Sequence, residues 1–177
     1  HWFATESFFL DYSLYDGPKA AKGSYAGARW DTQAWAANLA RTRDLLDKLK
    51  RPTVSVKPGQ YRTYLAPRAF ADVLGMMGWN ALSAAAWKQG RSPFKKLVER
   101  EARFSPLLSF GENFGLALTP RFNSQGEVSE SLLPLMQAGE LRTLLVSSRT
   151  AKEYGLSGNA ADEGEAPRAL DVSCGSM

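Results

Sequence analysis

The chain has 177 residues, of which 44% are hydrophobic and 23% charged, and its net charge is +4. This balance is typical of globular proteins and excludes a chain that is disordered throughout. No segment approaches the run of roughly 20 apolar residues that spans a bilayer. Cys174 is the only cysteine, which excludes an internal disulfide, and the basic residues are mixed with acidic ones, which favours a solvated surface over a nucleic-acid site.

The first 29 residues divide into an aromatic stretch and a stretch of small residues. Residues 2–15 are rich in Phe, Tyr and Trp and predict one strand or a pair of strands. Gly17 and Pro18 follow as a turn signal. Residues 19–29, with glycines at positions 23 and 27, are predicted to form a loop.

A helix is predicted over residues 31–50. Asp31 or Thr32 supplies an oxygen that can accept hydrogen bonds from the free N–H groups of the first helical turn. Apolar residues then recur near the helical period, and charged residues occupy much of the other face. Pro52 follows the end of the pattern.

The next segment predicts two short strands and one long helix. Val54–Val56 and Tyr61–Leu65 are rich in residues that favour strands. Pro67 suits the first turn of a helix, where a missing N–H group costs nothing. A broad apolar stripe over residues 67–88 predicts that this long helix is buried.

Short elements are predicted over residues 92–130. Ser92 and Pro93 indicate the start of a short helix, because serine caps helices and proline suits their first turn. Residues 107–110 predict a strand, and residues 111–130 a loop.

The last part of the chain predicts a hairpin, a helix and a loop. Residues 132–136 and 141–146 flank a turn and predict the hairpin. Residues 149–154 predict a short helix that ends at Gly155, and the small polar residues 156–168 predict an exposed loop. The whole set of elements predicts an α+β fold with antiparallel sheets.

Few residues can serve as metal ligands. Zinc needs three or four His, Cys or carboxylate ligands, and the only histidine is His1. Asp162, Glu163 and Glu165 form an acidic cluster whose spacing matches no calcium loop. A solvated acidic loop is therefore favoured, and a site for a hard cation is the alternative.

One serine has lysines close to it in the sequence. Ser92 lies near Lys95 and Lys96, which would permit a Ser–Lys nucleophile. A helix cap followed by a basic helix surface is the favoured interpretation.

Several short motifs resemble those of the TldD/PmbA (TldE) family in their order and spacing. The longest covers residues 56–74, where a Pro-Gly-x-Tyr turn leads to a strand ending in Leu-x-Pro and then to a helix. Further matches are residues 90–92, 104–109, 120–126, 135–145, 150–156 and 158–160. The resemblance covers residues 52–172. It implies that residues 1–51 are the end of the family's N-terminal α/β region with its connecting helix, that residues 52–177 are an incomplete C-terminal domain, and that the chain is a piece of a longer protein.

The resemblance also locates where a catalytic motif would lie. In the family's catalytic subunit the helix carries H-E-x-x-x-H, whose histidines bind zinc and whose glutamate acts as a base. The corresponding positions here are Gly75, Met76 and Asn80, which lack the chemistry of that motif. Gly75 and Gly78 each cost a helix about 1 kcal/mol relative to alanine, and the small apolar surface around them suits packing or a partner interface.

The resemblance implies a non-catalytic subunit or paralogue of a TldD/TldE-type zinc metalloprotease that matures or degrades peptides. The expected partner is a TldD-like catalytic subunit or a second copy of the chain, with zinc only in the catalytic partner. The assembly is expected to act on peptides in the bacterial cytoplasm, without a membrane or nucleic-acid partner, and the chain alone is not expected to be catalytic.

Two alternatives stay open. One is a non-enzymatic regulatory or binding protein, in line with the family's association with modulation of DNA gyrase. The other is an independent hydrolase that uses a Ser–Lys site at Ser92.

Overall fold

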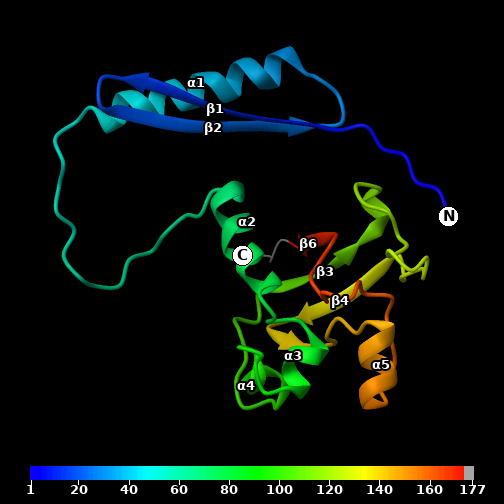
Figure 1. Cartoon of the computed structure of the whole chain (residues 1–177). Coiled ribbons are helices and arrows are strands. Elements are labelled where there is room, and N and C mark those ends of the chain that lie inside the picture. Colours follow the sequence, from blue (N-terminus) through cyan, green and yellow to red (C-terminus); the bar gives the residue numbers. More distant parts are fainter. Residues whose placement is uncertain (174–177) are drawn as a thin grey trace. The chain divides into compact units, whose positions relative to one another are not determined.

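The computed structural model describes residues 1–173 and separates into two units (Figure 1). The hairpin unit comprises residues 4–62, and the sheet unit comprises residues 63–173 with residues 1–3. Cys174 lies outside the described residues. The two units join at Arg62 in the sequence, and the family domain boundary expected after residue 51 stays a prediction.

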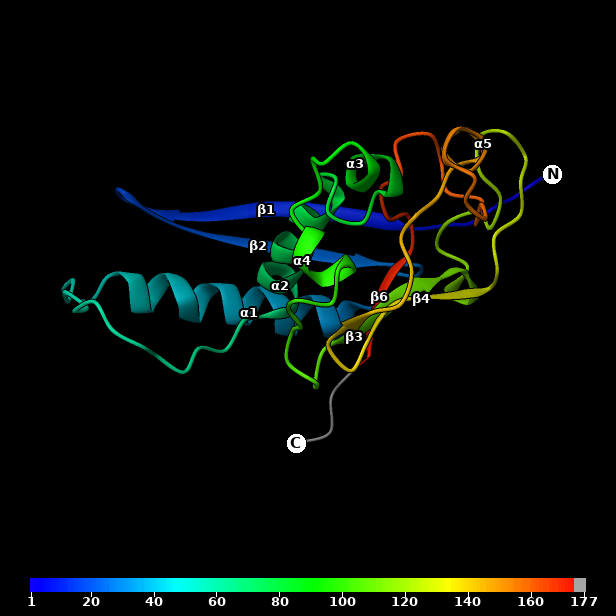
Figure 2. The same ribbon diagram turned by 90° about the horizontal axis from the view of Figure 1, so that it is seen from below.

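The hairpin unit consists of two antiparallel strands and one helix. Strand β1 (Phe8–Asp16) pairs with β2 (Lys19–Gly27) from Phe8↔Gly27 to Asp16↔Lys19. Helix α1 (Thr32–Leu49) lies along this hairpin (Figures 1 and 2). Asp31 caps α1 by accepting hydrogen bonds from the N–H groups of Gln33 and Ala34, so the predicted helix and its cap are confirmed.

The loop predicted over residues 19–29 is wrong, because most of it forms strand β2. Its small residues allow a close approach rather than a loop. A Cβ atom at Gly23 would lie 2.3 Å from the Tyr12 ring, and the Tyr12 hydroxyl donates to Asn38 Oδ1 of α1 at 2.6 Å. Glycine at this position therefore lets a tyrosine of β1 reach across β2 to the helix.

The two short strands predicted after α1 are also wrong. Residues 52–57 and 60–66 form neither helix nor strand. Val54, Val56 and Tyr64 are 79%, 69% and 85% exposed. Strand preference depends on a neighbouring strand and a surface to pack against, and these residues have neither among the described residues.

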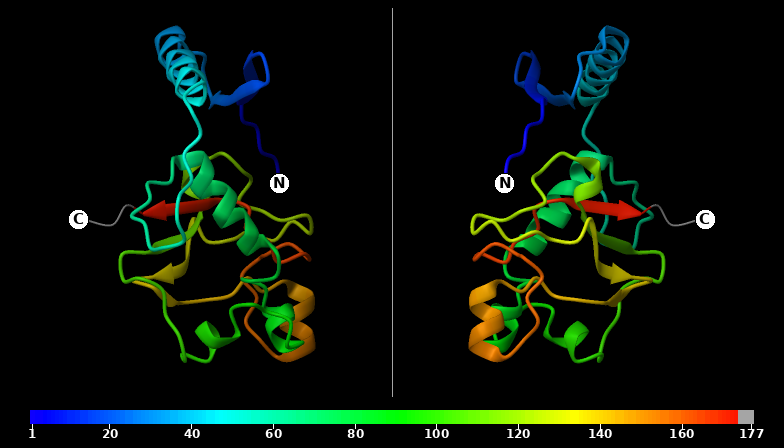
Figure 3. Two further views of the ribbon diagram at one scale, coloured as in Figure 1. Left: turned by 90° about the vertical axis from the view of Figure 1, so that its left-hand side faces the viewer. Right: turned by 90° about the vertical axis from the view of Figure 1, so that its right-hand side faces the viewer.

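A four-stranded antiparallel sheet forms the centre of the sheet unit, with the order β5-β4-β3-β6. Its strands are β3 (Ser109–Asn113), β4 (Leu132–Gln137), β5 (Glu140–Leu141) and β6 (Leu170–Ser173). Strand β6, red in Figure 3, pairs with β3 from Ser109↔Ser173 to Glu112↔Leu170. The buried core comprises Leu82, Phe110, Leu133, Leu135, Met136, Leu145 and Ala161. The predicted α+β class with antiparallel sheets is confirmed.

Short helices surround this sheet. They are α2 (Pro67–Gly75), η1 (Met76–Gly78, a 3-10 turn), α3 (Ala84–Lys88), α4 (Lys95–Val98), η2 (Phe114–Leu116, a 3-10 turn) and α5 (Ser148–Tyr154). Helix α5 agrees with its prediction to within one residue and ends at Gly155. Helix α4 begins later than predicted, at Lys95, although Ser92 Oγ accepts a hydrogen bond from the Phe94 N–H group.

The long buried helix predicted over residues 67–88 is wrong, since it is divided into α2, η1 and α3. Between η1 and α3, Ser83 forms an isolated parallel β-bridge with Leu145. The Leu145 N–H group donates to the Leu82 carbonyl, and the Ala84 N–H group donates to the Leu145 carbonyl. Only Leu74 of α2 is buried, whereas Ala81, Leu82, Ala84 and Ala86 are all buried. The predicted burial therefore holds for the second half of the segment and not for α2.

Three further boundaries differ from the predictions. Strand β3 begins at Ser109 rather than Leu107, and it extends into the predicted loop 111–130. The predicted hairpin is confirmed, but β5 (Glu140–Leu141) includes only Leu141 of the predicted second strand 141–146.

The loop predicted as exposed over residues 156–168 is tied into the core. Glu165 is 2% exposed. Its carboxylate accepts hydrogen bonds from Ser83 Oγ (2.6 Å), the Ala85 N–H group (2.8 Å), the Ser147 N–H group (2.9 Å) and Ser147 Oγ (3.0 Å). Small and polar composition predicted exposure, but these residues supply the acceptors that buried donors need.

No helix within residues 1–173 is both long enough and apolar enough to cross a membrane.

The Glu165 carboxylate predicts a dependence of stability on pH. Burial raises the pKa of this carboxyl, but hydrogen bonds from Ser83, Thr150, Ala85 and Ser147 outweigh burial and lower the pKa below its ordinary value. A lowered pKa contributes stability above the unfolded-state pKa of about 4.3, and this stability is lost as the pH falls through the folded-state pKa. We expect the free energy of unfolding from urea titrations to fall below about pH 4.3.

Glu165→Gln should reduce that pH dependence and lower the free energy of unfolding at pH 7 by about 1–3 kcal/mol, because a buried N–H donor would lose its acceptor. The exposed neighbour variant Glu163→Gln is the control and should change neither quantity. Equal behaviour of the two variants would contradict the structural role of Glu165.

Gly139 in the β4–β5 turn should tolerate no side chain. Its φ is +77°, and a Cβ atom would lie 2.3 Å from the Phe104 carbonyl oxygen. We expect Gly139→Ala to lower the free energy of unfolding by about 2–4 kcal/mol, through backbone strain and overpacking. Gly164→Ala is the matched control, since nothing lies within 4 Å of its Cβ position. Equal unfolding midpoints for the two variants would refute this account of the turn.

Candidate functional site

The three positions that correspond to the family's catalytic motif do not share one helix. Gly75 is the last residue of α2, Met76 begins η1, and Asn80 lies beyond η1 with a φ of 68°. Residues four apart, such as Met76 and Asn80, share a face only along a continuous helix. The picture of these positions on one buried helix is therefore wrong.

The surface around these positions is apolar and exposed. Val73 is 40% exposed, Met76 50% and Trp79 74%. A Cβ atom added at Gly75 or Gly78 would meet nothing within 4 Å. We call Val73, Met76 and Trp79 the α2–η1 patch; a cluster of this kind suits contact with another protein better than contact with water.

The acidic cluster at residues 162–165 is separated in the structure. Asp162 Oδ1 accepts hydrogen bonds from the Ser124 N–H group and Ser124 Oγ, at 2.9 and 3.0 Å. Glu163 is exposed, whereas Glu165 is buried among its donors. The prediction of a solvated acidic loop is therefore wrong for Glu165. Within residues 1–173 no three His, Cys, Asp or Glu side chains are placed to hold a metal ion.

Ser92 is occupied by structural hydrogen bonds. It is 7% exposed, and its Oγ donates to the Ala81 carbonyl at 3.2 Å while it accepts from the Phe94 N–H group. Lys95 forms an ion pair with Glu99 at 3.9 Å, and Lys96 is exposed. The structure gives no nucleophile–base pair at this serine.

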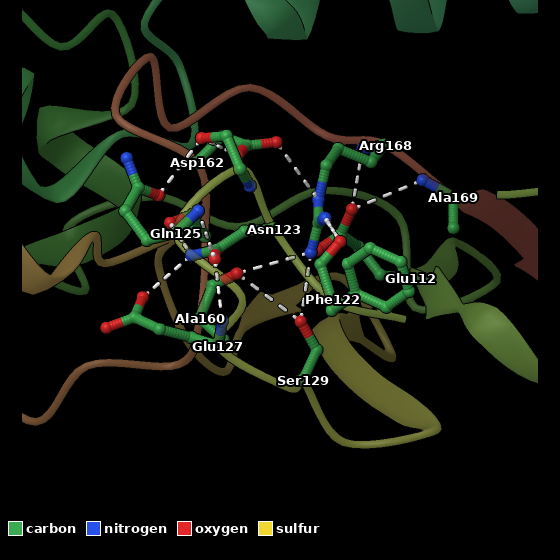
Figure 4. Close-up of polar contacts among 12 residues, drawn as sticks. Glu112, Phe122, Asn123, Gln125, Glu127, Ser129, Ala160, Asp162, Arg168 and Ala169 are labelled. Carbon is green, nitrogen blue, oxygen red and sulfur yellow. Dashed lines mark hydrogen bonds and ion pairs between the residues drawn. The ribbon is translucent and has the colours of Figure 1, made fainter. Parts of the chain in front are cut away.

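A polar network around Arg168 joins the turn 120–129 to the loop 160–169 (Figure 4). The Arg168 guanidinium donates to the Phe122 carbonyl (2.9 Å), Ser129 Oγ (3.0 Å) and the Ala160 carbonyl (3.2 Å). Its Nε lies 3.6 Å from Asp162 Oδ2, an ion pair without a hydrogen bond. This arginine thereby holds the two segments together.

Glu112 and Asn123 complete the polar network. Glu112 is 1% exposed, and its Oε1 accepts from the N–H groups of Arg168 (2.5 Å) and Ala169 (3.2 Å). Asn123 Oδ1 accepts from the N–H groups of Gln125 and Glu127. Hydrogen bonds from Ser148 and Asn123 lower the pKa of the Glu127 carboxyl, against a smaller effect of burial. Each of these groups is engaged within the fold, which indicates a structural network rather than a reactive site.

A groove lies between α4 and β5 in the sheet unit. Its cavity of about 570 Å³ is lined by Leu97, residues 100–103 and residues 140–142. A second cavity of about 340 Å³ shares Leu97, Arg100 and Arg142 with it and adds Trp87, Leu144 and Leu156. We call the two together the arginine groove, after Arg100, Arg103 and Arg142. No sequence pattern indicated this groove, since residues 97–103 and 140–142 meet only in the folded chain.

One family model matches the chain. The model of the PmbA/TldA metallopeptidase C-terminal domain matches residues 58–173. A comparison with curated proteins gives no match.

Three solved structures have a similar fold. The first, a proposed modulator of DNA gyrase from Thermotoga maritima, is 18% identical with a TM-score of 0.68, and the alignment covers 94% of this chain and 40% of that one. The second, a proposed modulator of DNA gyrase from Bacteroides thetaiotaomicron, is 17% identical with a TM-score of 0.70 over 96% of this chain and 38% of that one. The third, TldE from Thermococcus kodakarensis, is 12% identical with a TM-score of 0.62 over 96% of this chain and 41% of that one.

The chain thus spans about two fifths of the length of these structures, and at such identities the likeness concerns the fold. The match of the family model covers well over half of the chain. The resemblance found in the motifs is confirmed, and the chain belongs to the PmbA/TldD metallopeptidase family, with residues 58–173 as the family's C-terminal domain.

Proposed function

We propose that this chain acts as the non-catalytic part of a TldD/TldE-type peptide-processing assembly in the cytoplasm. The observation that carries the proposal is the chemistry at the motif positions. Gly75 has no side chain, Met76 offers a thioether, and Asn80 offers an amide. These residues do not fit zinc, which prefers imidazole, thiolate and carboxylate ligands, and none of them can act as a general base.

The α2–η1 patch supports a partner interface. Trp and Met are enriched at protein interfaces, where a few large side chains supply most of the binding energy. Val73, Met76 and Trp79 supply such side chains at the place where a catalytic subunit would carry its motif. We therefore propose that the patch contacts a TldD-like catalytic subunit.

Two of the similar structures are named as proposed modulators of DNA gyrase, and this favours a regulatory function as the second candidate. That function requires the chain to change the rate at which purified gyrase supercoils DNA. Protease assembly requires no such effect, so the supercoiling assay separates the two.

The assembly can be tested by mixing the chain with a TldD-type catalytic subunit from the same genome. We expect a complex by light scattering at micromolar concentration and faster hydrolysis of an unfolded peptide than with the catalytic subunit alone. Met76→Asp and Trp79→Asp should each weaken the complex at least about 10-fold, or 1.4 kcal/mol, because a charge would be buried in an apolar interface.

Both variants should keep the parent unfolding midpoint, since these side chains are half or more exposed. Lys152→Asp on the exposed surface of α5 is the control and should leave the complex intact. A chain that remains alone in the mixture, with no rise in hydrolysis, would rule out the proposal.

Metal content gives a separate test. We expect the purified chain, dialysed against buffer that contains a micromolar concentration of zinc, to carry far less than one zinc ion per molecule by mass spectrometry of the metal. Stoichiometric zinc would overturn the proposal that catalysis belongs to the partner.

A further inference from the structure

The arginine groove is lined by both apolar and charged side chains. Leu97, Leu141 and Leu144 supply apolar surface, and Trp87 and Leu156 extend it in the adjoining cavity. Most binding sites for peptides and small molecules pair such a surface with a few placed polar groups. The groove therefore has the composition of a binding site.

Two of the arginines lack a counter-ion. Arg100 and Arg103 are exposed, and neither forms an ion pair within residues 1–173. Arg142 lies 3.7 Å from Glu140, and Glu101 also lines the groove. Three arginines against two glutamates leave the lining with a net charge of +1. A ligand with a carboxylate would complement this surplus, and arginine binds carboxylates through two parallel hydrogen bonds.

Arg100 occupies a backbone position that favours glycine. Its φ is +61°, and it directly follows Glu99, the C-cap residue of α4. The Arg100 N–H group donates to the Leu97 carbonyl, and the Glu101 N–H group donates to the Lys96 carbonyl, the pattern of a Schellman motif, in which glycine is usual. The left-handed backbone is unfavourable for arginine. Stability of the turn therefore does not explain why arginine rather than glycine stands here, which points to a role for its side chain in the groove.

The groove also borders an open strand edge. Strand β5 is the last strand of its sheet, and the Arg142 N–H group donates to the Leu135 carbonyl of β4. Because bonded and non-bonded pairs alternate in an antiparallel ladder, Leu141 directs its N–H and carbonyl groups away from β4. Residues 104–108 pair with the outer edge at Gly139: the Phe104 N–H group donates to the Gly139 carbonyl, and the Gly139 N–H group donates to the Leu108 carbonyl. Leu141 lies two residues further along the same edge.

We propose that the arginine groove binds an extended acidic peptide, whose backbone pairs with Leu141 and whose carboxylate lies against Arg100 and Arg103. An apolar side chain of the peptide enters the cavity beside Trp87 and Leu156. Extended peptides add to open sheet edges in this way, with main-chain bonds for affinity and alternate side chains for specificity. The inference rests on the proposed function and adds to it the class of peptide that the assembly receives.

The test uses the chain alone, without a catalytic subunit. The probe is a fluorescein-labelled decapeptide of alternating valine and glutamate, followed by fluorescence anisotropy. We expect saturable binding that weakens at least 10-fold when lysine replaces glutamate, and also when alternate peptide nitrogens are methylated. No binding, or equal binding of the lysine peptide, would overturn the proposal.

Arg100→Gly is the sharpest variant. Glycine suits the backbone at this position, so we expect a higher unfolding midpoint together with binding at least 5-fold weaker. Arg103→Ala should also weaken binding, whereas Lys152→Ala, on α5 outside the groove, should not. Unchanged binding by Arg100→Gly and Arg103→Ala would refute the site without any question of misfolding.

Two further outcomes are decisive. Tighter binding of a 12-nucleotide single strand of DNA than of the acidic peptide would reject a peptide site in favour of a nucleic-acid site. Arg100→Gly should still form the complex with the catalytic subunit, since the α2–η1 patch is unchanged. Loss of peptide binding with retained assembly therefore tests the groove, and failure of assembly by the parent chain tests the proposed function.

Discussion

A carboxylate buried between two helix N-termini constrains the sheet unit more than any other group. An ionised carboxylate removed from water is costly unless several donors surround it. Glu165 meets that demand with Ser83 and Ser147, the N-cap residues of α3 and α5. The N-terminal ends of both helices also carry partial positive charge, so one side chain holds both helices at a common point. Figure 1 shows α3 and α5 on the same side of the sheet, where they contact each other.

The same physical device recurs on the other loops. Glu112 on β3 holds the backbone at Arg168 and Ala169, and the Arg168 side chain holds the turn 120–129. Buried polar groups of this kind specify one arrangement, because any other leaves a donor or acceptor unsatisfied. The loops that connect the short strands are thus held by specific hydrogen bonds. The groove and the α2–η1 patch lie outside these polar networks, which leaves their side chains free for a partner or peptide.

Local signals in the sequence predicted the elements that depend on neighbours in the chain. Helix α1 begins at its capping Asp31, α5 ends at Gly155, and the β4–β5 hairpin turns at Gly139. The failures depend on whether a segment finds another segment to pair with. Residues 19–27 became a strand because β1 pairs with them, and the apolar stripe 67–88 broke because Ser83 bridges to Leu145.

The same distinction applies to the sites. Motif spacing placed Gly75, Met76 and Asn80 without a structure, but it could not show that their helix is divided. The surplus charge at Arg100 and Arg103 was hidden in a stretch of mixed charge, since the apolar surface that completes the groove comes from residues 141–144 and 156. Likewise, Glu165 carried no local sign that it would be buried.

The position of Glu165 and β6 in the chain has a consequence for biosynthesis. Strand β3 has β4 on one side and β6 on the other, and β6 ends at Ser173. Until residues 165–173 have left the ribosome, β3 has an open edge, and the N-termini of α3 and α5 lack their shared acceptor. Unpaired edges in incomplete chains are prone to aggregation. The nascent sheet unit is therefore most in need of chaperone protection during the translation of the interval between β4 and β6.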